Sequence, residues 1–415
     1  MNKPLKNRIE DLAIFSGKKL FDKPRPIGQL WSLDRKIFHE LVNQIYENHR
    51  ITNNGELIKT LESELRELHS CNYVIAFANA SIAIAALLKI INKDYYSQKN
   101  GEVILPAFTY VGLPHLIRWA GLKPIFVDVD EQNHTLSPEA SLEKINSNTA
   151  AILPVHQVNR PVNIDEFSAI SSKFDIPIIY DAVHGVFCRV DNVPVGGFGL
   201  AEVFSLHATK LINGFEGGYV TTNDKSLKEK LRTIRNFGII SGDNVDSIGI
   251  NGKLNEIHAA SALSSLNSSK EILSGNKRRF NKYTEVFSKI PGLSWVDYEE
   301  HPETGGVYEY NYEFFLLAVP ESWPLDRDTL VRMLRDEGAL ARGYYSPPVH
   351  LSSHFPSGQT VPSLPITEML SKRYIQMPVG ELVNEDDIVA LGDWFLFVYK
   401  HSEQISKKLG GYTNE

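Results

Sequence analysis

The sequence is poor in cysteine, with only Cys71 and Cys188 among 415 residues. The two lie far apart, and neither belongs to a CxxC pair or to a cysteine and histidine spacing typical of zinc sites. This argues against a disulfide framework, a structural zinc site and an iron-sulfur cluster. We therefore predict that both cysteines are buried as small apolar side chains and that the protein has no metal centre.

Long hydrophobic runs are also missing. The longest apolar stretch, SIAIAALLKI at residues 81 to 90, is too short to span a bilayer. Residues 1 to 17 contain no apolar segment of the length found in signal peptides. We expect a cytoplasmic protein that has no membrane partner.

The chain has no excess of positive charge. Its formal net charge is -7, and its only basic cluster is the short stretch GNKRRF around Lys277. Because proteins that bind polyanions carry a broad basic surface, we expect no nucleic-acid partner. The cluster is interpreted as the polar decoration of a helix.

The composition is otherwise ordinary for a soluble globular protein, with 42% hydrophobic and 22% charged residues. A chain of this length exceeds what one hydrophobic core usually serves, so we expect one large and one smaller domain. From about residue 72, short β-branched runs alternate with helix-length segments, which is typical of a mostly parallel sheet with helices on both faces. The runs are NYVIAF, EVILP, PIFVDVD, AAILPV and PIIYDAV.

The pattern changes after Pro291-Gly292, where strand-like runs such as YEYNYEFFLLAV become isolated. Long helices are predicted over residues 273–290, 326–337 and 384–399. We therefore expect an α/β fold with a smaller α+β domain at its C-terminal end. The predicted units are an N-terminal arm with helices at 1–60, a large α/β domain at 61–272, and a linking helix with the small domain at 273–415.

Polar residues follow two of the predicted strands, where ligands of open α/β sheets bind. Ala78-Asn79-Ala80-Ser81 opens a helix, which fits either a phosphate held at the helix N-terminus or a simple N-cap. Asp181 and His184 follow PIIY. A buried acid at that place needs N–H donors, a cation or a metal, and one acid with one histidine is too little to define a metal site.

Lys210 is the only charged residue from Phe204 through Phe215, in the segment FSLHATKLINGF. Burial drives a lysine toward its neutral amine, the form that attacks a carbonyl to make a Schiff base. A side chain that extends along the apolar surface to reach solvent is the alternative.

The three turns together hold the components of a pyridoxal 5'-phosphate (PLP) site. Lys210 provides the amine, Asp181 a carboxylate for the pyridine nitrogen, and residues 79–81 a phosphate cup. Tyr110, in LPAFTYVG just past another strand, is the candidate for stacking on the cofactor ring.

With these residues in place, the chain resembles the DegT/StrS sugar aminotransferases, which are PLP enzymes of fold type I. HATK followed by EGG, with DxxH upstream, is the most specific combination. The other blocks in family register are LPAFTYVGLPHLIRWAGLKPIFVDVD, PVHQVNRPVNID, YDAVHGVF, FSLHATKLINGFEGGYVTTND, RNFG, GINGKLNEIHAA and LPITEMLSKRYIQMPVG.

The resemblance implies a role for each matching residue. Lys210 is expected to bind the cofactor as a Schiff base, Asp181 to pair with its ring nitrogen, His184 to contact its phenolic oxygen, and Tyr110 to stack on its ring. Residues that the resemblance places on the phosphate are Ala80, Ser81, Ser205 and, from a partner subunit, Asn251. The family pattern thus implies a homodimer with shared active sites.

A second resemblance concerns LAIFSGKKLFDKPRPIGQ, HQVNRP and the NGK at 251–253. They are similar to the branch that transfers an amino group from L-glutamate to C4 of dTDP-4-keto-6-deoxyglucose, for bacterial surface polysaccharide or deoxyaminosugar biosynthesis. Val158-Asn159 and Val162-Asn163 depart from that branch, so amination at C3 or of another nucleotide-linked keto sugar stays open. Arg235, Tyr344 and His350 align with positions near the substrate, and each of them has a purely structural alternative.

Two further classes of protein are weighed. Relatives that deoxygenate sugars carry histidine in the lysine position, and both Lys210 and the lack of suitably spaced cysteines speak against that chemistry. A non-catalytic regulator that binds PLP or a nucleotide sugar is the other alternative, although every catalytic position holds a competent residue.

Overall fold

The structure is a computed structural model that describes residues 6–28, 34–95, 101–157, 161–297, 308–352 and 361–412. Val158 and Asn159, where the chain departs from the C4 branch, lie outside these residues. Within the described ranges, no helix is long and apolar enough to cross a membrane. The cytoplasmic location stays a prediction.

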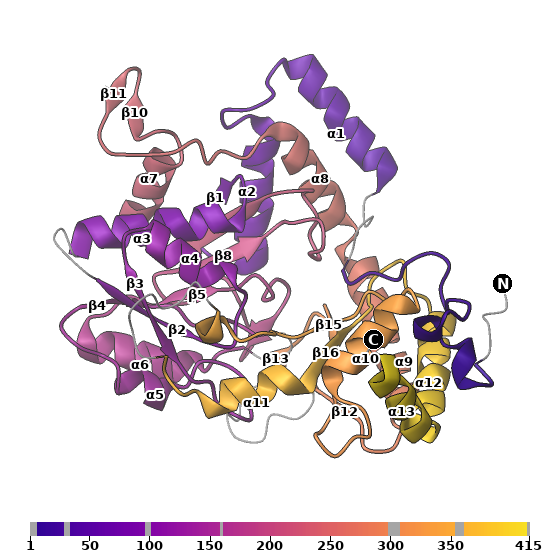
Figure 1. The fold of residues 1–415 in the computed structure, drawn as a ribbon. Helices are drawn as coiled ribbons and strands as arrows, with labels where there is room; N and C mark the ends of the chain where they lie inside the picture. Colours follow the sequence, from indigo (N-terminus) through magenta and orange to yellow (C-terminus); the bar gives the residue numbers. More distant parts are fainter. Residues whose placement is uncertain are drawn as a thin grey trace.

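Seven strands build a central sheet at the heart of the larger part of the chain (Figure 1). Parallel bridges from Ile152 to Ile178 and from Val155 to Asp181 join its two halves, which have the strand orders β3-β2-β4 and β1-β9-β8-β5. The strands are β1 (Tyr73–Phe77), β2 (Glu102–Pro106), β3 (Lys123–Val127), β4 (Thr149–Ile152), β5 (Ile179–Asp181), β8 (Ala201–Ser205) and β9 (Gly218–Thr222). The predicted α/β class and its parallel sheet are confirmed.

One strand runs against the others, because β9 pairs antiparallel with both β1 and β8. Parallel neighbours need a long crossover, usually through a helix. The segment between β8 and β9 contains no helix, so the chain turns back directly. Lys210 lies in this turn.

Strand side chains alternate between two apolar layers, as a sheet that is covered on both faces requires. In β1, Val74 and Ala76 pack into the layer under helices α2, α6 and α8, whereas Ile75 and Phe77 pack into the layer under α3, α4 and α7. These helices are α2 (Glu56–His69), α3 (Ala80–Tyr95), α4 (Gly112–Trp119), α6 (Ile164–Phe174), α7 (Lys225–Ile234) and α8 (Glu256–Asn267).

A second sheet with the order β12-β14-β16-β15 organises the C-terminal part, and all its pairs are antiparallel. Its core also takes in Leu12 and Phe15, so the N-terminal segment lies against the C-terminal helices, as Figure 1 shows. The strands are β12 (Ser294–Trp295), β14 (Phe315–Ala318), β15 (Arg342–Gly343) and β16 (Tyr374–Met377). The helices are α9 (Ser269–Phe287), α10 (Arg327–Asp336), α11 (Pro365–Arg373), α12 (Glu385–Lys400) and α13 (Ser402–Tyr412). The division at residues 60 and 272 stays a prediction.

The strand-like run at 308–319 is divided in two. Tyr308–Glu309 forms β13, which pairs with β6 (Arg189–Val190), and the chain re-enters strand geometry only at β14. Between them, the amide of Asn311 donates to the carbonyls of His184 and Val186, both 2.9 Å away. These bonds draw the segment from residue 310 to residue 314 against the turn that follows β5.

The remaining elements are short or peripheral. They are η1 (Ile9–Asp11), η2 (Ala13–Phe15), α1 (Arg35–Asn48), α5 (Pro138–Leu142), β7 (Val193–Pro194), β10 (Ile239–Ser241), β11 (Asn244–Val245) and η3 (Val349–Leu351). Both cysteines are free; Cys71 is buried and Cys188 is half-buried.

Candidate active site

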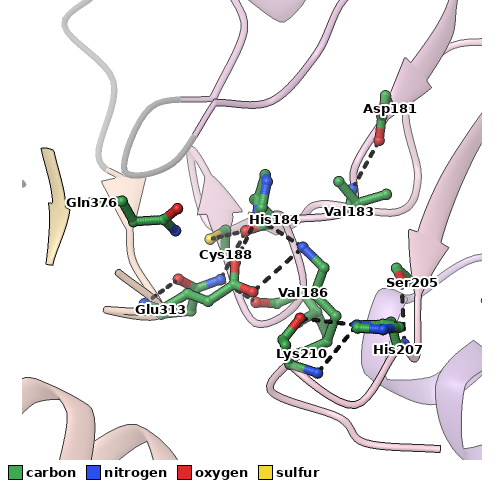
Figure 2. A network of polar contacts seen from close by, with 12 residues as sticks. Asp181, Val183, His184, Val186, Cys188, Ser205, His207, Lys210, Glu313 and Gln376 are labelled. Atoms are coloured by element: carbon green, nitrogen blue, oxygen red, sulfur yellow. Dashed lines mark hydrogen bonds and ion pairs between the residues drawn. The ribbon is translucent and has the colours of Figure 1, made fainter. Parts of the chain in front are cut away.

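Four of the predicted residues gather at the carboxyl ends of β5 and β8 (Figure 2). Asp181 is the last residue of β5 and His184 lies three residues further on, whereas Ser205 ends β8 and Lys210 follows in the next turn. Because β5 and β8 are parallel neighbours, the turns that follow them leave the same edge of the sheet.

Asp181 is an acid held in an almost dry place, with 5% of its surface exposed. Its Oδ1 accepts a hydrogen bond from the Val183 N–H at 3.2 Å. Burial raises the pKa of this carboxyl to about 6, although the Val183 bond and the charge of Lys210 oppose the shift. The structure therefore offers a carboxylate that gains from a cationic partner.

Lys210 lies in a hydrogen-bonded turn and its side chain is mostly buried. Its N–H donates to the His207 carbonyl at 2.8 Å, and the turn is anchored to α8 by the Ser261 hydroxyl, which donates to the Asn213 carbonyl. The side chain is only 12% exposed. Burial lowers the pKa of the Lys210 amine, which favours the uncharged, nucleophilic form.

His184 and Glu313 complete the surroundings of the Lys210 amine. The Nδ1 atom of His184 lies 3.0 Å from Lys210 Nζ and 2.8 Å from Glu313 Oε2, and the other oxygen of Glu313 lies 3.6 Å from Nζ. Burial lowers the pKa of the His184 imidazole, so its ring is neutral near pH 7. Glu313 was not among the predicted site residues.

A signal for Glu313 was nevertheless present in the sequence. It is the only charged residue in YNYEFFLLAV, residues 310–319, just as Lys210 is in its own apolar segment. A charge in such a run is costly to bury unless it finds a partner. The identity of that partner could not be predicted, since 129 positions separate Glu313 from His184.

The predicted phosphate cup lies beside Ser205. Asn79 Oδ1 accepts from the Ile82 N–H at 2.8 Å and so caps α3, while the first turn of any helix leaves further N–H groups for an anion. A Cβ atom at Gly218 would lie 2.3 Å from the Ala80 nitrogen, so only glycine lets the start of α3 approach β9 this closely. Gly218 pairs with Ser205, which brings the hydroxyl close to the cup.

These residues fit PLP. A buried carboxyl without an ion pair among the described residues, an amine of lowered pKa and a helix N-terminus next to a hydroxyl match the cofactor's ring nitrogen, aldehyde and phosphate. Within the described ranges, no group of three or more histidine, cysteine, aspartate or glutamate side chains is placed to hold a metal ion.

Tyr110 and Asn251 are both exposed on the described part of the chain. Tyr110 sits between β2 and α4 with 65% of its surface exposed, and Asn251 is an exposed residue that bridges to Asn236. Ring stacking by Tyr110 and contact of Asn251 with a partner's phosphate stay predictions.

The two predicted substrate residues near 344–350 have polar partners other than Lys210. The Tyr344 hydroxyl donates to Gln157 at 3.0 Å, and His350 is fully buried with its Nε2 3.4 Å from Glu368. The neighbouring Tyr345 does reach the site, because its hydroxyl lies 3.5 Å from His184 Nε2. Substrate contact by Tyr344 and His350 stays a prediction.

Arg235 is built into the protein core. It is 6% exposed, and its guanidinium contacts Glu62 at 3.1 Å and the carbonyl of Ala76. It borders a cavity of about 290 Å³, and its carbonyl accepts from Gly252, whose own carbonyl accepts from Ala78 before the cup. The cavity is lined by Asn53, Asn54, Arg232, Arg235, Asn236 and Lys253. Substrate contact by Arg235 stays a prediction.

Because Arg235 is buried, its replacement is expected to lower the free energy of unfolding. Arg235→Ala leaves the Glu62 carboxylate without its buried partner, which costs about 3 kcal/mol of unfolding free energy, measured by urea denaturation. Arg232→Ala is the matched control, because Arg232 contacts the same carboxylate at 3.3 Å but is 41% exposed, and it should cost less than about 1 kcal/mol. Unchanged stability together with a raised KM for the sugar would show that Arg235 serves the substrate instead.

Comparisons with known proteins identify the family of the chain. The family model described as DegT/DnrJ/EryC1/StrS aminotransferase matches residues 33–393. A dTDP-4-amino-4,6-dideoxy-D-glucose transaminase of Shigella dysenteriae is 33% identical over 303 residues, which cover 73% of this chain and 79% of the relative. A protein of the same name from Escherichia coli is 28% identical over 377 residues, 89% of this chain and 97% of the relative.

A solved structure matches over nearly the whole chain. The crystal structure of DesI in the presence of its TDP-sugar product has a TM-score of 0.88 at 30% identity, covering 97% of this chain and 99% of DesI. The predicted family resemblance and the predicted fold are therefore confirmed.

Proposed function

Because the chain belongs to the DegT/DnrJ/EryC1/StrS aminotransferase family, we propose that it transfers an amino group from L-glutamate to C4 of dTDP-4-keto-6-deoxyglucose. The class of this enzyme, a PLP-dependent nucleotide-sugar aminotransferase, follows from the family. The single observation that carries the proposal is the meeting of Lys210 with Asp181 and His184 at neighbouring strand ends. The names of the relatives from Shigella dysenteriae and Escherichia coli support the sugar and its C4 position.

The protein residues have distinct tasks in this reaction. When bound, PLP takes up the electron pair that is released as the amino-bearing carbon loses its proton. Asp181, when ionised, would hold the ring nitrogen in its protonated form, because a cation beside it offsets the cost of burying the carboxylate. Lys210 Nζ would hold the cofactor through its aldehyde and, as a free amine, would take up the proton of the substrate carbon and return it.

The phosphate and the partner subunit belong to the same proposal. Ala80, Ser81 and Ser205 would hold the phosphate through N–H and hydroxyl groups at the α3 terminus. Asn251, exposed on the described chain, would reach the phosphate of a second subunit, which makes the active form a homodimer.

The test is an assay for amino transfer with defined substrates. Purified protein is incubated with L-glutamate and a panel of 4-keto and 3-keto nucleotide sugars, and product regiochemistry is read by NMR. We expect 2-oxoglutarate and an amino group at C4 of the dTDP-linked sugar. A C3 product would correct the substrate, whereas visible absorbance that does not respond to glutamate would support a binding protein without turnover.

A further inference from the structure

One nitrogen atom of His184 serves two neighbours that cannot use it in the same way. Nδ1 lies 2.8 Å from Glu313 Oε2 and 3.0 Å from Lys210 Nζ. In a neutral imidazole, Nδ1 carries either a proton to donate or a lone pair to accept, and never both. The contact with the carboxylate requires the proton, and a contact with a charged lysine requires the lone pair.

The other contacts favour the tautomer with the proton on Nδ1. Burial raises the pKa of Glu313, but the neighbouring Lys210 and His184 bring it below its usual range, so its carboxylate is ionised and only accepts. The Tyr345 hydroxyl lies 3.5 Å from His184 Nε2 and can donate only if Nε2 is unprotonated. Glu313 thus fixes the imidazole with Nδ1–H toward itself and Nε2 as an acceptor.

The second oxygen of Glu313 is left over by this arrangement. The Glu313 side chain is only 3% exposed, so Oε1 is shielded from water, and it accepts no hydrogen bond among the described residues. The nearest cation is the Lys210 amine at 3.6 Å, just beyond hydrogen-bond distance. A buried carboxylate oxygen without a hydrogen bond lowers the stability of the fold. Its position beside a lysine that gains and loses charge therefore indicates a function.

We propose that Glu313 is a positioning residue with two simultaneous tasks: its Oε2 fixes the tautomer of His184, and its Oε1 receives the ammonium of Lys210 whenever that side chain is free and charged. While Lys210 is bound to the cofactor, it has no free ammonium group to donate to Oε1. When Lys210 is free and takes up a proton at Nζ, a shift of about 0.8 Å turns the 3.6 Å contact into a charge-assisted hydrogen bond. The inference rests on the proposed function, because only a covalent bond to the cofactor makes Lys210 alternate in this way.

Glu313 acts on Lys210 among a small set of charges. Asp181 from the end of β5 also favours the ammonium, whereas Arg342 from β15 opposes it. The Phe314 ring lies 5.9 Å from Nζ and adds a weak attraction. Of these two acids, Glu313 forms the ion pair with Nζ, at 3.6 Å. Removing its charge is therefore expected to change the pKa of Lys210 more than removing the charge of Asp181.

The test measures the charge of Lys210 without any turnover. Full-length protein freed of cofactor is trace-labelled with acetic anhydride across a pH series, and peptide mass spectrometry gives the acetylated fraction of Lys210. Glu313→Gln, which keeps the shape and removes the charge, should lower the midpoint of this curve by about one pH unit. Glu313→Asp, which keeps the charge, should have a midpoint close to that of the wild type.

Glu202→Gln is the matched control. Glu202 is also fully buried beside a histidine, with its carboxylate 3.7 Å from His156, whereas the ion pair of Lys210 is with Glu313. This variant should leave the acetylation midpoint at the wild-type value. A Glu313→Gln midpoint equal to or above wild type, or an equal fall in Glu202→Gln, would overturn the proposal.

A kinetic measurement completes the design. In the holoenzyme, Glu313→Gln should lower kcat about tenfold with little change in the KM of the sugar, since the residue positions the base and does not bind substrate. A changed KM with an unchanged kcat would contradict the proposal. If the wild-type protein transfers no amino group, the proposed function fails, and the acetylation midpoint still decides the role of Glu313.

Discussion

Lys210→Ala is expected to lower kcat by about four orders of magnitude, the largest effect of any single substitution in this protein. The alanine protein loses both the amine that binds the cofactor aldehyde and the group that moves the proton. Asp181 and the phosphate cup remain, so cofactor should still bind without a covalent bond. The measurements are the rate of 2-oxoglutarate formation and the mass gained on borohydride reduction, which should vanish.

Two substitutions separate the chemistry of Lys210 from its charge. Lys210→Arg keeps a cation in the same place but has no accessible neutral form, so it should be as inactive as the alanine variant. Lys173→Ala removes an exposed lysine from α6 and should keep full activity and full mass gain. Borohydride trapping at another lysine in the wild-type protein would contradict the assignment of Lys210.

The proposed shared sites give the alanine variant a further use. Lys210→Ala and Asn251→Asp should each be poorly active alone, because the second places a negative charge against the cofactor phosphate. In a mixed dimer, however, one of the two sites combines the intact Lys210 of the Asn251→Asp chain with the intact Asn251 of the Lys210→Ala chain. The other site carries both substitutions. Equal mixing with subunit exchange should therefore restore about a quarter of wild-type activity, and no restoration would contradict the shared site.

The residues predicted from sequence are those whose chemistry can be read locally. Asp181 and Lys210 each stand at or just after the carboxyl end of an apolar strand, and parallel strands bring such ends together without any knowledge of side-chain packing. The start of α3 was found for the same reason. Their combination already indicates the cofactor, and the family resemblance adds Ser205 and the role of each residue.

Contacts between distant segments could not be predicted in this way. Glu313 reaches His184 only because Asn311 ties its segment to the turn after β5, and this bond interrupts what reads as one continuous strand. Tyr345 rather than Tyr344 faces His184 because the ring of Tyr344 turns toward Gln157. A pattern with period two cannot decide which of two adjacent tyrosines points inward when the segment is not a regular strand.

The second large effect is expected from Asp181→Asn, which should lower kcat about a thousandfold. Asparagine has almost the same shape as aspartate but carries no charge, so it cannot hold a protonated ring nitrogen by an ion pair. The fall should appear in kcat, with cofactor bound at saturating concentration. A variant that keeps more than a tenth of the wild-type kcat would show that the ring nitrogen needs no anionic partner here.

The same substitution should make the cofactor-free protein more stable. Burial raises the pKa of Asp181 to about 6 from an unfolded value of 3.8, so the folded state binds this proton more tightly than the unfolded state. This contribution to stability is complete below about pH 4 and is lost as the pH rises through about 6. At about pH 8, Asp181→Asn should therefore exceed wild type by about 3 kcal/mol, whereas at about pH 4 the two should be equal.

Addition of PLP should reverse this order, and the reversal distinguishes a functional carboxylate from a merely strained one. A ring nitrogen that carries a proton supplies the cation that the buried Asp181 lacks, so cofactor binding stabilises the wild type more than the asparagine variant. Urea denaturation at about pH 8, with and without saturating PLP, measures both differences. If PLP raised the unfolding free energy of the two proteins equally, the Asp181 carboxylate would contribute nothing to cofactor binding. Its pairing with the ring nitrogen would then be refuted.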